Sequence, residues 1–215
     1  MFKSQFIDAA VASNALRFGS FTLKSGRISP YFFNLGLFNS GEVLVQLATA
    51  YATTILESGI EFDVIFGPAY KGIPIAALTV AKIAELDPSK GKLEYAFNRK
   101  EAKDHGEGGN IVGGSLEGRR VLVVDDVITA GTAINEARTI IEAAKGTIVG
   151  VVTALDRQER TADSTVSALT AVSQRFNVPV LSIVNLSDII AHLSSSLSAE
   201  QLQALKDYQK QYGAA

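Results

Sequence analysis

Apolar residues alternate along the chain between short continuous runs and helical repeats. Continuous or β-branched runs predict strands, whereas apolar residues spaced three and four apart predict helices. We expect strands at 64–66, 93–97, 121–124, 148–155 and 180–183, and helices at 73–84, 133–144, 166–176, 186–193 and 199–212. Alternating strands and helices of this kind form a doubly wound, mostly parallel sheet, so the expected fold class is α/β.

The first forty residues have a different pattern. Helical spacing of Phe6, Ile7, Ala10, Val11 and Leu16 predicts an amphipathic helix, and a second helix is expected at 43–56. Glycine and proline divide residues 18–34 into short aromatic pieces, which predicts a hairpin or loop outside the main sheet. We call this part the hood. Without repeats or a linker, residues 1–215 are expected to form one domain, to which residues 1–40 contribute a helix and the hood.

Composition narrows the classes of function. The chain has 215 residues, a net charge of −2, no cysteine and two histidines. Disulfides and cysteine-bound metals are therefore excluded, and a zinc site built from protein ligands is disfavoured. The weak negative charge argues against nucleic acid or a membrane surface as the main partner. With no signal-like segment or apolar run of membrane-spanning length, we expect a cytoplasmic protein.

Residues 121–133 join a buried strand, two acids and a turn of small and hydroxyl-bearing residues. The turn at Thr129–Thr132 precedes a helix, whose N-terminus and free N–H groups favour a phosphate. Asp125 and Asp126 would repel that phosphate, but they suit sugar hydroxyls or a divalent cation held through water. A sugar phosphate would suit both the turn, which favours a phosphate, and the two acids, which favour hydroxyl groups. The alternative is a strand, an acidic turn and a capped helix such as any α/β protein contains.

Two further segments carry positive charge after strands. Residues 66–74 place Tyr70 and Lys71 in a turn shaped by glycine and proline, which suits a diphosphate. Residues 99–110 combine four cationic or histidine side chains with three glycines, as a mobile lid would. The alternatives are an ordinary turn with a solvated lysine and a solvated charged loop.

These segments resemble those of a known family. Residues 121–133 resemble the signature of type I phosphoribosyltransferases, in which the acids hold the ribose hydroxyls of phosphoribosyl diphosphate (PRPP) and the turn wraps the 5-phosphate. Residues 66–74 resemble the family's pyrophosphate loop, whose non-proline cis peptide would be Ala69–Tyr70 here. Motifs at 22–27, 30–34, 97–109 and 155–160 together resemble the orotate phosphoribosyltransferase family.

The resemblance implies a set of site residues and a reaction. PRPP would be bound by Lys24, Tyr70, Lys71, Arg99, Lys100, Lys103, His105, Asp125, Asp126, Val127, Ile128, Thr129, Ala130, Gly131, Thr132 and Ala133. Catalytic roles would fall to Lys103, His105, Asp125 and Asp126, and orotate contacts to Phe32, Phe33, Thr129 and Arg157. The ribosyl group would pass to N1 of orotate with release of pyrophosphate, in UMP biosynthesis. Mg²⁺ would be the cofactor, with no dedicated protein ligands and with Asp125 acting through water.

The resemblance also implies a homodimer with shared active sites, in which the 99–110 lid of one subunit covers its neighbour's diphosphate. From the residues alone, core packing remains the better interpretation of Phe32 and Phe33. A surface ion pair with Asp156 or Glu159 likewise remains the better interpretation of Arg157.

Three other functions remain open from the sequence. They are a non-catalytic PRPP sensor that regulates transcription, a phosphatase with Asp125 as nucleophile, and a phosphoribosyltransferase acting on a purine or uracil. The sensor lacks an evident DNA-binding element, and the phosphate-binding turn argues against the phosphatase.

Overall fold

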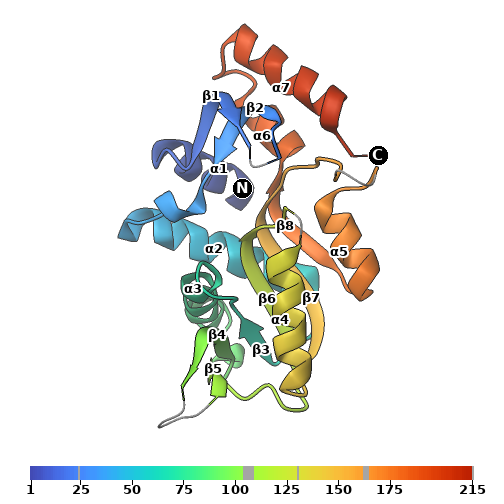
Figure 1. Cartoon of the computed structure of the whole chain (residues 1–215). Coiled ribbons are helices and arrows are strands. Elements are labelled where there is room, and N and C mark those ends of the chain that lie inside the picture. Colours follow the sequence, from blue (N-terminus) through green and yellow to red (C-terminus); the bar gives the residue numbers. More distant parts are fainter. Residues whose placement is uncertain (24, 104–108, 130, 162–164, 215) are drawn as a thin grey trace.

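A six-stranded sheet forms the centre of the computed structural model, which describes residues 1–23, 25–103, 109–129, 131–161 and 165–214 (Figure 1). The strands are β3 (Val64–Phe66), β4 (Glu94–Lys103), β5 (Gly109–Gly113), β6 (Arg120–Val127), β7 (Thr147–Asp156) and β8 (Val180–Asn185). Their order is β5-β4-β3-β6-β7-β8. Only β4 and β5 pair antiparallel among these neighbours. The predicted α/β class with a mostly parallel sheet is confirmed.

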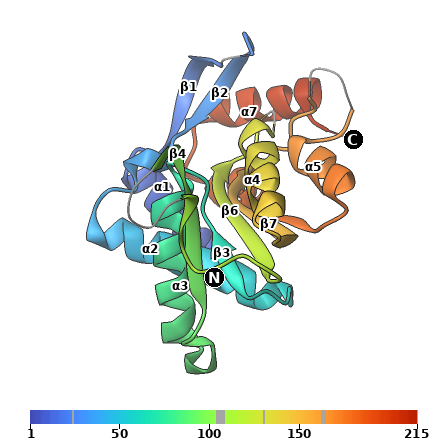
Figure 2. The same cartoon turned by 60° about the horizontal axis from the view of Figure 1, so that its bottom comes forward.

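Helices cover both faces of this sheet (Figures 1 and 2). One face packs against α2 (Gly41–Ser58) and α3 (Gly72–Leu86), and the other against α4 (Thr132–Ala143) and α5 (Ala168–Phe176). The remaining helices are α6 (Leu186–Leu193), which follows β8, and α7 (Ala199–Tyr212), with short 3-10 turns η1 (Leu35–Leu37) and η2 (Pro88–Lys90). Side chains alternate within β3, so Val64 and Phe66 pack with α4 and α5, while Ile65 packs with α2 and α3. No helix within the described ranges is long and apolar enough to cross a membrane.

The hood is a two-stranded antiparallel sheet of β1 (Leu16–Thr22) and β2 (Ile28–Phe33), preceded by α1 (Phe2–Ala12). It lies with α7 beyond the end of the sheet at which β8 passes into α6 (Figure 1). Tyr31 of β2 meets Tyr208 of α7 edge to face, with ring centroids 6.4 Å apart. The hood therefore covers the edge formed by the carboxyl ends of the parallel strands, where such sheets bind ligands.

The last two helices have the bounds that the apolar spacing predicts. Each begins with a capping box, formed by Asn185 and Asp188 in α6 and by Ser198 and Gln201 in α7. In such a box the first residue's side chain accepts from the backbone of the fourth, and the fourth accepts in return. The helix expected at 166–176 begins later, at Ala168, because Ser167 caps it by accepting from Thr170 N at 3.2 Å.

Two expectations about the first helix are wrong. Val11, predicted to lie on its apolar face, is exposed. Leu16, predicted to lie on the same face, begins β1 instead. The Ser13 hydroxyl donates to the Ala9 carbonyl at 2.8 Å, and Asn14 has a φ of 59°. A left-handed residue breaks the helical path, and asparagine tolerates that conformation better than most side chains.

The segment 99–110, expected to be a loop, is largely a hairpin. Strand β4 continues to Lys103 and β5 returns from Gly109, with Asn98 opposite Ile111 and Phe97 opposite Val112. Residues 104–108 lie outside the described part. Strand β3 pairs with β4 only as far as Ala96, so the hairpin extends past the end of its neighbour. The polar composition of this segment concealed the strands because β-propensity depends strongly on context.

The turn between β3 and α3 brings two glycines into backbone contact. A Cβ on Gly67 would lie 2.0 Å from the Gly72 carbonyl oxygen, and a Cβ on Gly72 would lie 2.7 Å from the Gly67 carbonyl carbon. The Gly67 amide donates to the Ala96 carbonyl at 2.9 Å, so the turn is also tied to β4. Only glycine allows this approach without moving the main chain.

We therefore expect Gly67→Ala to lower the free energy of unfolding by about 1–3 kcal/mol or more, as overpacking does. Gly41→Ala is the matched control, because a Cβ at Gly41 meets no atom within 4 Å. Urea unfolding of both variants measures the difference. Equal stability of the two variants would contradict the close packing of the turn.

Candidate active site

Two acids form the end of the central strand β6. Asp125 is 7% exposed, whereas Asp126 is half-buried. The Asp125 carboxylate accepts from its neighbour's amide at 2.9 Å, and the Asp126 carboxylate accepts from Val127 N at 2.8 Å. The Tyr51 hydroxyl of α2 donates to the Asp125 carbonyl at 2.7 Å. Backbone and buried tyrosine together fix the orientation of both acids.

The electrostatics of this pair are unfavourable for full ionisation. Burial raises the pKa of Asp125 to about 6, and the nearby Asp126 charge acts in the same direction. Hydrogen bonding to the Asp126 amide and the charge of Lys71 oppose the rise. Asp125 is therefore a group whose charge changes near neutral pH, as functional carboxylates often do.

Lys71 joins the loop after β3 to the acids after β6. Its ammonium lies 2.6 Å from an Asp126 carboxylate oxygen, while 59% of the lysine side chain remains exposed. The neighbouring Tyr70 is 71% exposed and follows a cis peptide bond from Ala69. The predicted cis bond is confirmed, and the structure brings the expected diphosphate loop to the same edge as the two acids.

Asn98, a residue that the sequence analysis did not single out, fastens this loop. Its side chain is 8% exposed, and its carbonyl oxygen accepts from Ala69 N at 2.9 Å. Its amide group donates to the Arg99 carbonyl at 3.4 Å. The loop after β3 is therefore held from the base of the β4–β5 hairpin. The Phe97–Gly109 motif contains Asn98, but nothing in the sequence indicated its partner.

The turn after β6 ends in Gly131, which has a φ of 73° and forms the N-cap of α4. No side chain caps this helix within the described residues, so its first N–H groups are available to a ligand. Thr129, Thr132 and Ala133 are exposed there, whereas Ile128 is buried. Ala130 lies outside the described residues. The arrangement suits a phosphate.

Arg157 follows β7 and points into the hood. Its Nε donates to Glu159 at 2.8 Å and its Nη2 to the Ser29 hydroxyl at 3.1 Å. Its guanidinium lies 4.3 Å from the Tyr31 ring centroid. The ion pair with Glu159 is present, but it is not on the surface, since both side chains are only 13% exposed.

Phe32 and Phe33 lie on opposite faces of β2. Phe33 packs toward the core, 6.5 Å from the Phe6 ring centroid. Phe32 lies 5.6 Å from the Phe21 ring, and the Arg17 guanidinium lies 5.4 Å from the Phe32 centroid. Core packing therefore describes Phe33, whereas Phe32 belongs to a smaller aromatic cluster on the hood.

The remaining predicted residues belong to the lid and the hood turn. Arg99 and Lys100 lie on β4, where Arg99 is half-buried and Lys100 is exposed. Lys103 ends β4, and its side chain is not described. His105 and Lys24 lie outside the described residues. The side chains of Lys103, His105 and Lys24 are therefore outside the described part of the structure.

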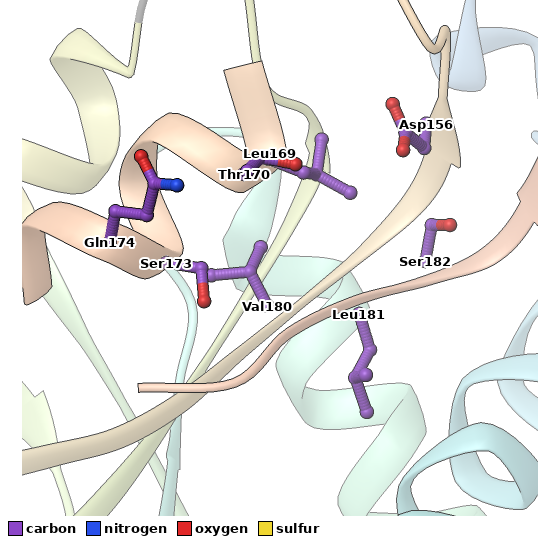
Figure 3. A pocket seen from close by; sticks show the side chains of 8 residues that line it. All are labelled: Asp156, Leu169, Thr170, Ser173, Gln174, Val180, Leu181 and Ser182. Carbon is purple, nitrogen blue, oxygen red and sulfur yellow. The ribbon is translucent and has the colours of Figure 1, made fainter. Parts of the chain in front are cut away.

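A cavity of about 400 Å³ lies elsewhere, between α5 and the last two strands (Figure 3). Its lining is Asp156, Leu169, Thr170, Ser173, Gln174, Val180, Leu181 and Ser182. Of the predicted site residues that the structure describes, none contributes to it. The candidate site is instead an open edge beneath the hood.

Known proteins are similar to this chain in sequence and in fold. Residues 38–181 match the phosphoribosyl transferase domain family. Orotate phosphoribosyltransferases from Yarrowia lipolytica and Escherichia coli are 60% and 54% identical over 98% and 99% of this chain, and over 97% and 98% of theirs. A crystal structure of the Francisella tularensis orotate phosphoribosyltransferase covers 98% of this chain and all of its own, with 43% identity and a TM-score of 0.87. The chain belongs to the phosphoribosyltransferase family and, within it, to the orotate phosphoribosyltransferases.

Proposed function

We propose that the chain transfers the 5-phosphoribosyl group of PRPP to N1 of orotate, giving orotidine 5′-monophosphate and pyrophosphate in UMP biosynthesis. The observation that carries this proposal is the meeting of two acids, a lysine-bearing loop and an uncapped helix N-terminus at one sheet edge. Anions suit the helix N-terminus and Lys71, and sugar hydroxyls suit the acids. An anionic base would bind next to the positive charge of Arg157, beneath the hood.

In the proposed reaction, positive charge develops on the ribose and negative charge on the departing pyrophosphate. Asp125 and Asp126 stabilise the first, and Lys71 with the lid cations stabilises the second. Lys103 and His105 are proposed to neutralise or protonate pyrophosphate. The N–H groups at the start of α4 hold the 5-phosphate. Most of the catalytic effect would therefore come from fixed charges that match the transition state.

We propose Mg²⁺ as the cofactor. In the described part of the chain, no three acidic, histidine or cysteine side chains are arranged to hold a metal ion. Asp125 and Asp126 supply carboxylate oxygens, which fit an ion that takes most of its ligands from substrate oxygens and water. The ion would neutralise diphosphate charge, while the acids orient the ribose hydroxyls.

A phosphatase with Asp125 as nucleophile fits the site poorly. The carboxylate is almost fully buried and accepts from the following amide. Its raised pKa also reduces the fraction ionised below neutral pH. A nucleophilic carboxylate attacks in its ionised form, so both the hydrogen bond from the Asp126 amide and the raised pKa count against this role.

The base is tested by a panel of orotate, uracil, hypoxanthine and adenine with PRPP and Mg²⁺. We expect turnover with orotate alone. Arg157→Ala should raise the KM for orotate roughly ten- to a hundredfold, because a charged hydrogen bond contributes about 1.5–3 kcal/mol, while the KM for PRPP stays the same. Arg138→Ala is the control, since Arg138 forms an exposed pair with Glu142. Faster turnover of another base would overturn the assignment.

Removing the Asp125 charge should have opposite effects on activity and on stability. The folded pKa lies above the ordinary value of 3.8, so protonated Asp125 stabilises the fold at low pH, and this contribution is lost as pH rises through about 6. Asp125→Asn should therefore raise the free energy of unfolding by up to about 3 kcal/mol near neutral pH. It should also lower kcat roughly a hundredfold or more.

Urea unfolding at pH 4 and pH 7.5 measures the first effect, which should shrink at the lower pH. The wild-type kcat/KM for PRPP should fall as pH drops below about 6, where Asp125 takes up a proton. An Asp125→Asn variant that is less stable at neutral pH would contradict the raised pKa of Asp125. A variant that keeps its kcat would show that catalysis does not need the Asp125 charge.

We also propose a homodimer in the cytoplasm whose lids cross between subunits. The β4–β5 hairpin extends past the end of β3 and so projects from the sheet edge, and the absence of cysteine suits a reducing compartment. Lys103→Ala and Asp125→Ala homodimers should each be inactive.

Refolded together, those two variants should recover roughly a quarter of the wild-type activity. Half of randomly paired dimers are mixed, and one of their two sites combines an intact Asp125 with an intact Lys103. Steady-state rates after co-refolding measure this, with subunit exchange checked by differently tagged chains. No recovery despite exchange would show that each lid serves its own subunit.

A further inference from the structure

Glu159 lies between two arginines beneath the hood. Its carboxylate is 2.7 Å from Arg157 Nη2 and 3.7 Å from Arg27 Nη1. The glutamate side chain is 13% exposed, and those of Arg157 and Arg27 are 13% and 21% exposed. A carboxylate so removed from water is costly unless it is paired, and these two cations, with the Tyr208 side chain, are its partners.

The carboxylate occupies one defined edge of the Arg157 guanidinium. Nε and Nη2 both meet the same Glu159 oxygen, and Nη2 also donates to the Ser29 hydroxyl. The ring of Tyr31 packs against the flat face of the guanidinium. The Tyr208 side chain of α7 also interacts with both Arg157 and Glu159. The hydrogen bonds that the described residues make with the Arg157 guanidinium at defined atoms use Nε and Nη2, and none uses Nη1. Glu159 thus leaves Nη1 as the donor that a substrate can use.

Arg27 and the backbone of Glu159 link the hood to the end of α7. Arg27, in the turn of the hood hairpin, donates to the Arg160 carbonyl at 3.1 Å and lies over the Tyr212 ring, 5.0 Å from its centroid. Glu159 itself forms a β-bridge with Gly213. The hood, the segment after β7 and the end of α7 therefore meet around one negative charge.

We propose that Glu159 is a positioning residue for the base: it fixes the Arg157 guanidinium so that Nη1 serves the orotate carboxylate, and it holds the hood over that site through Arg27. This rests on the proposed function. The three side chains carry a net charge of +1, which a substrate carboxylate would neutralise. Without Glu159, two partly buried guanidinium groups would lack the carboxylate that now lies between them.

Glu159 does not act as an internal competitor of the substrate. It uses the Nε side of Arg157, whereas a ligand would use the Nη1 side, so the two carboxylates have separate donors. Removing its charge should therefore weaken orotate binding rather than strengthen it. The direction of the effect distinguishes a positioning role from competition.

The test compares Glu159→Gln with Glu117→Gln, whose exposed carboxylate pairs only with Lys145 at 2.6 Å among the described residues. Glu159→Gln should raise the KM for orotate roughly tenfold and leave the KM for PRPP within about twofold, as expected when a charge-assisted contact is misplaced. Glu159→Asp keeps the charge and should recover part of the loss. Amide hydrogen exchange in β2 should be faster in Glu159→Gln only.

A double-mutant cycle with Arg157→Ala tests whether Glu159 acts through that arginine. In the Arg157→Ala background, Glu159→Gln should change the KM for orotate by less than about twofold. Full additivity, a lower KM for orotate in Glu159→Gln, or faster hood exchange with an unchanged KM would each overturn the proposal. If Glu159→Gln does not fold, Glu159→Asp in the same cycle decides by the same criteria.

Failure of the proposed function has a different outcome. If Arg157→Ala leaves the KM for orotate unchanged, the contact between Arg157 and the base is wrong. If Arg157→Ala raises that KM and the Glu159 variants do not, only the positioning role is wrong.

Discussion

The parallel pairing of β3 with β6 is the constraint on which the whole site depends. Ile65 lies opposite Leu122, and both strands are buried on both faces. A shift by one residue would exchange the side chains that fill the two cores, so the register is strongly specified. This register places the loop after β3 beside the acids at the end of β6. Strand β3 ends opposite Val123, so the loop that follows it runs past the last residues of β6, where Lys71 pairs with Asp126.

The site is built from charges that the fold tolerates rather than from charges that stabilise it. A protonated Asp125 would suit its buried position better than the ionised form does. The Tyr51 hydroxyl holds the Asp125 main chain and the Asp126 amide holds the Asp125 carboxylate, but neither contact removes the cost of burying the charge. The same pattern recurs under the hood, where one carboxylate serves two guanidinium groups. At Asp125, position is maintained at the expense of stability, as is common at functional sites.

The sequence predicted β3, β6, β7, β8, the first half of β4 and most helix bounds, because apolar runs and capping residues act locally. It also predicted the loop after β3 and the acids after β6, because the carboxyl ends of parallel strands share one edge. It could not predict contacts that depend on distant segments. Tyr51 reaches a carbonyl 74 positions away, and Arg157 reaches Ser29 across 128 positions. The edge strand β5 was missed because its partner β4, rather than its own composition, makes it a strand.

The order of synthesis separates the two halves of this site in time. Every strand of the sheet, with the turns after β3 and β6, precedes α7 in the chain. The segment after β7 is paired only by the end of α7, where Gly213 bridges Glu159 and Ala214 N donates to the Gln158 carbonyl at 2.8 Å. The half of the site for which we propose contacts with the sugar phosphate is therefore synthesised before the half for which we propose contacts with the base. The second half is complete only once residues 199–214 have packed against it.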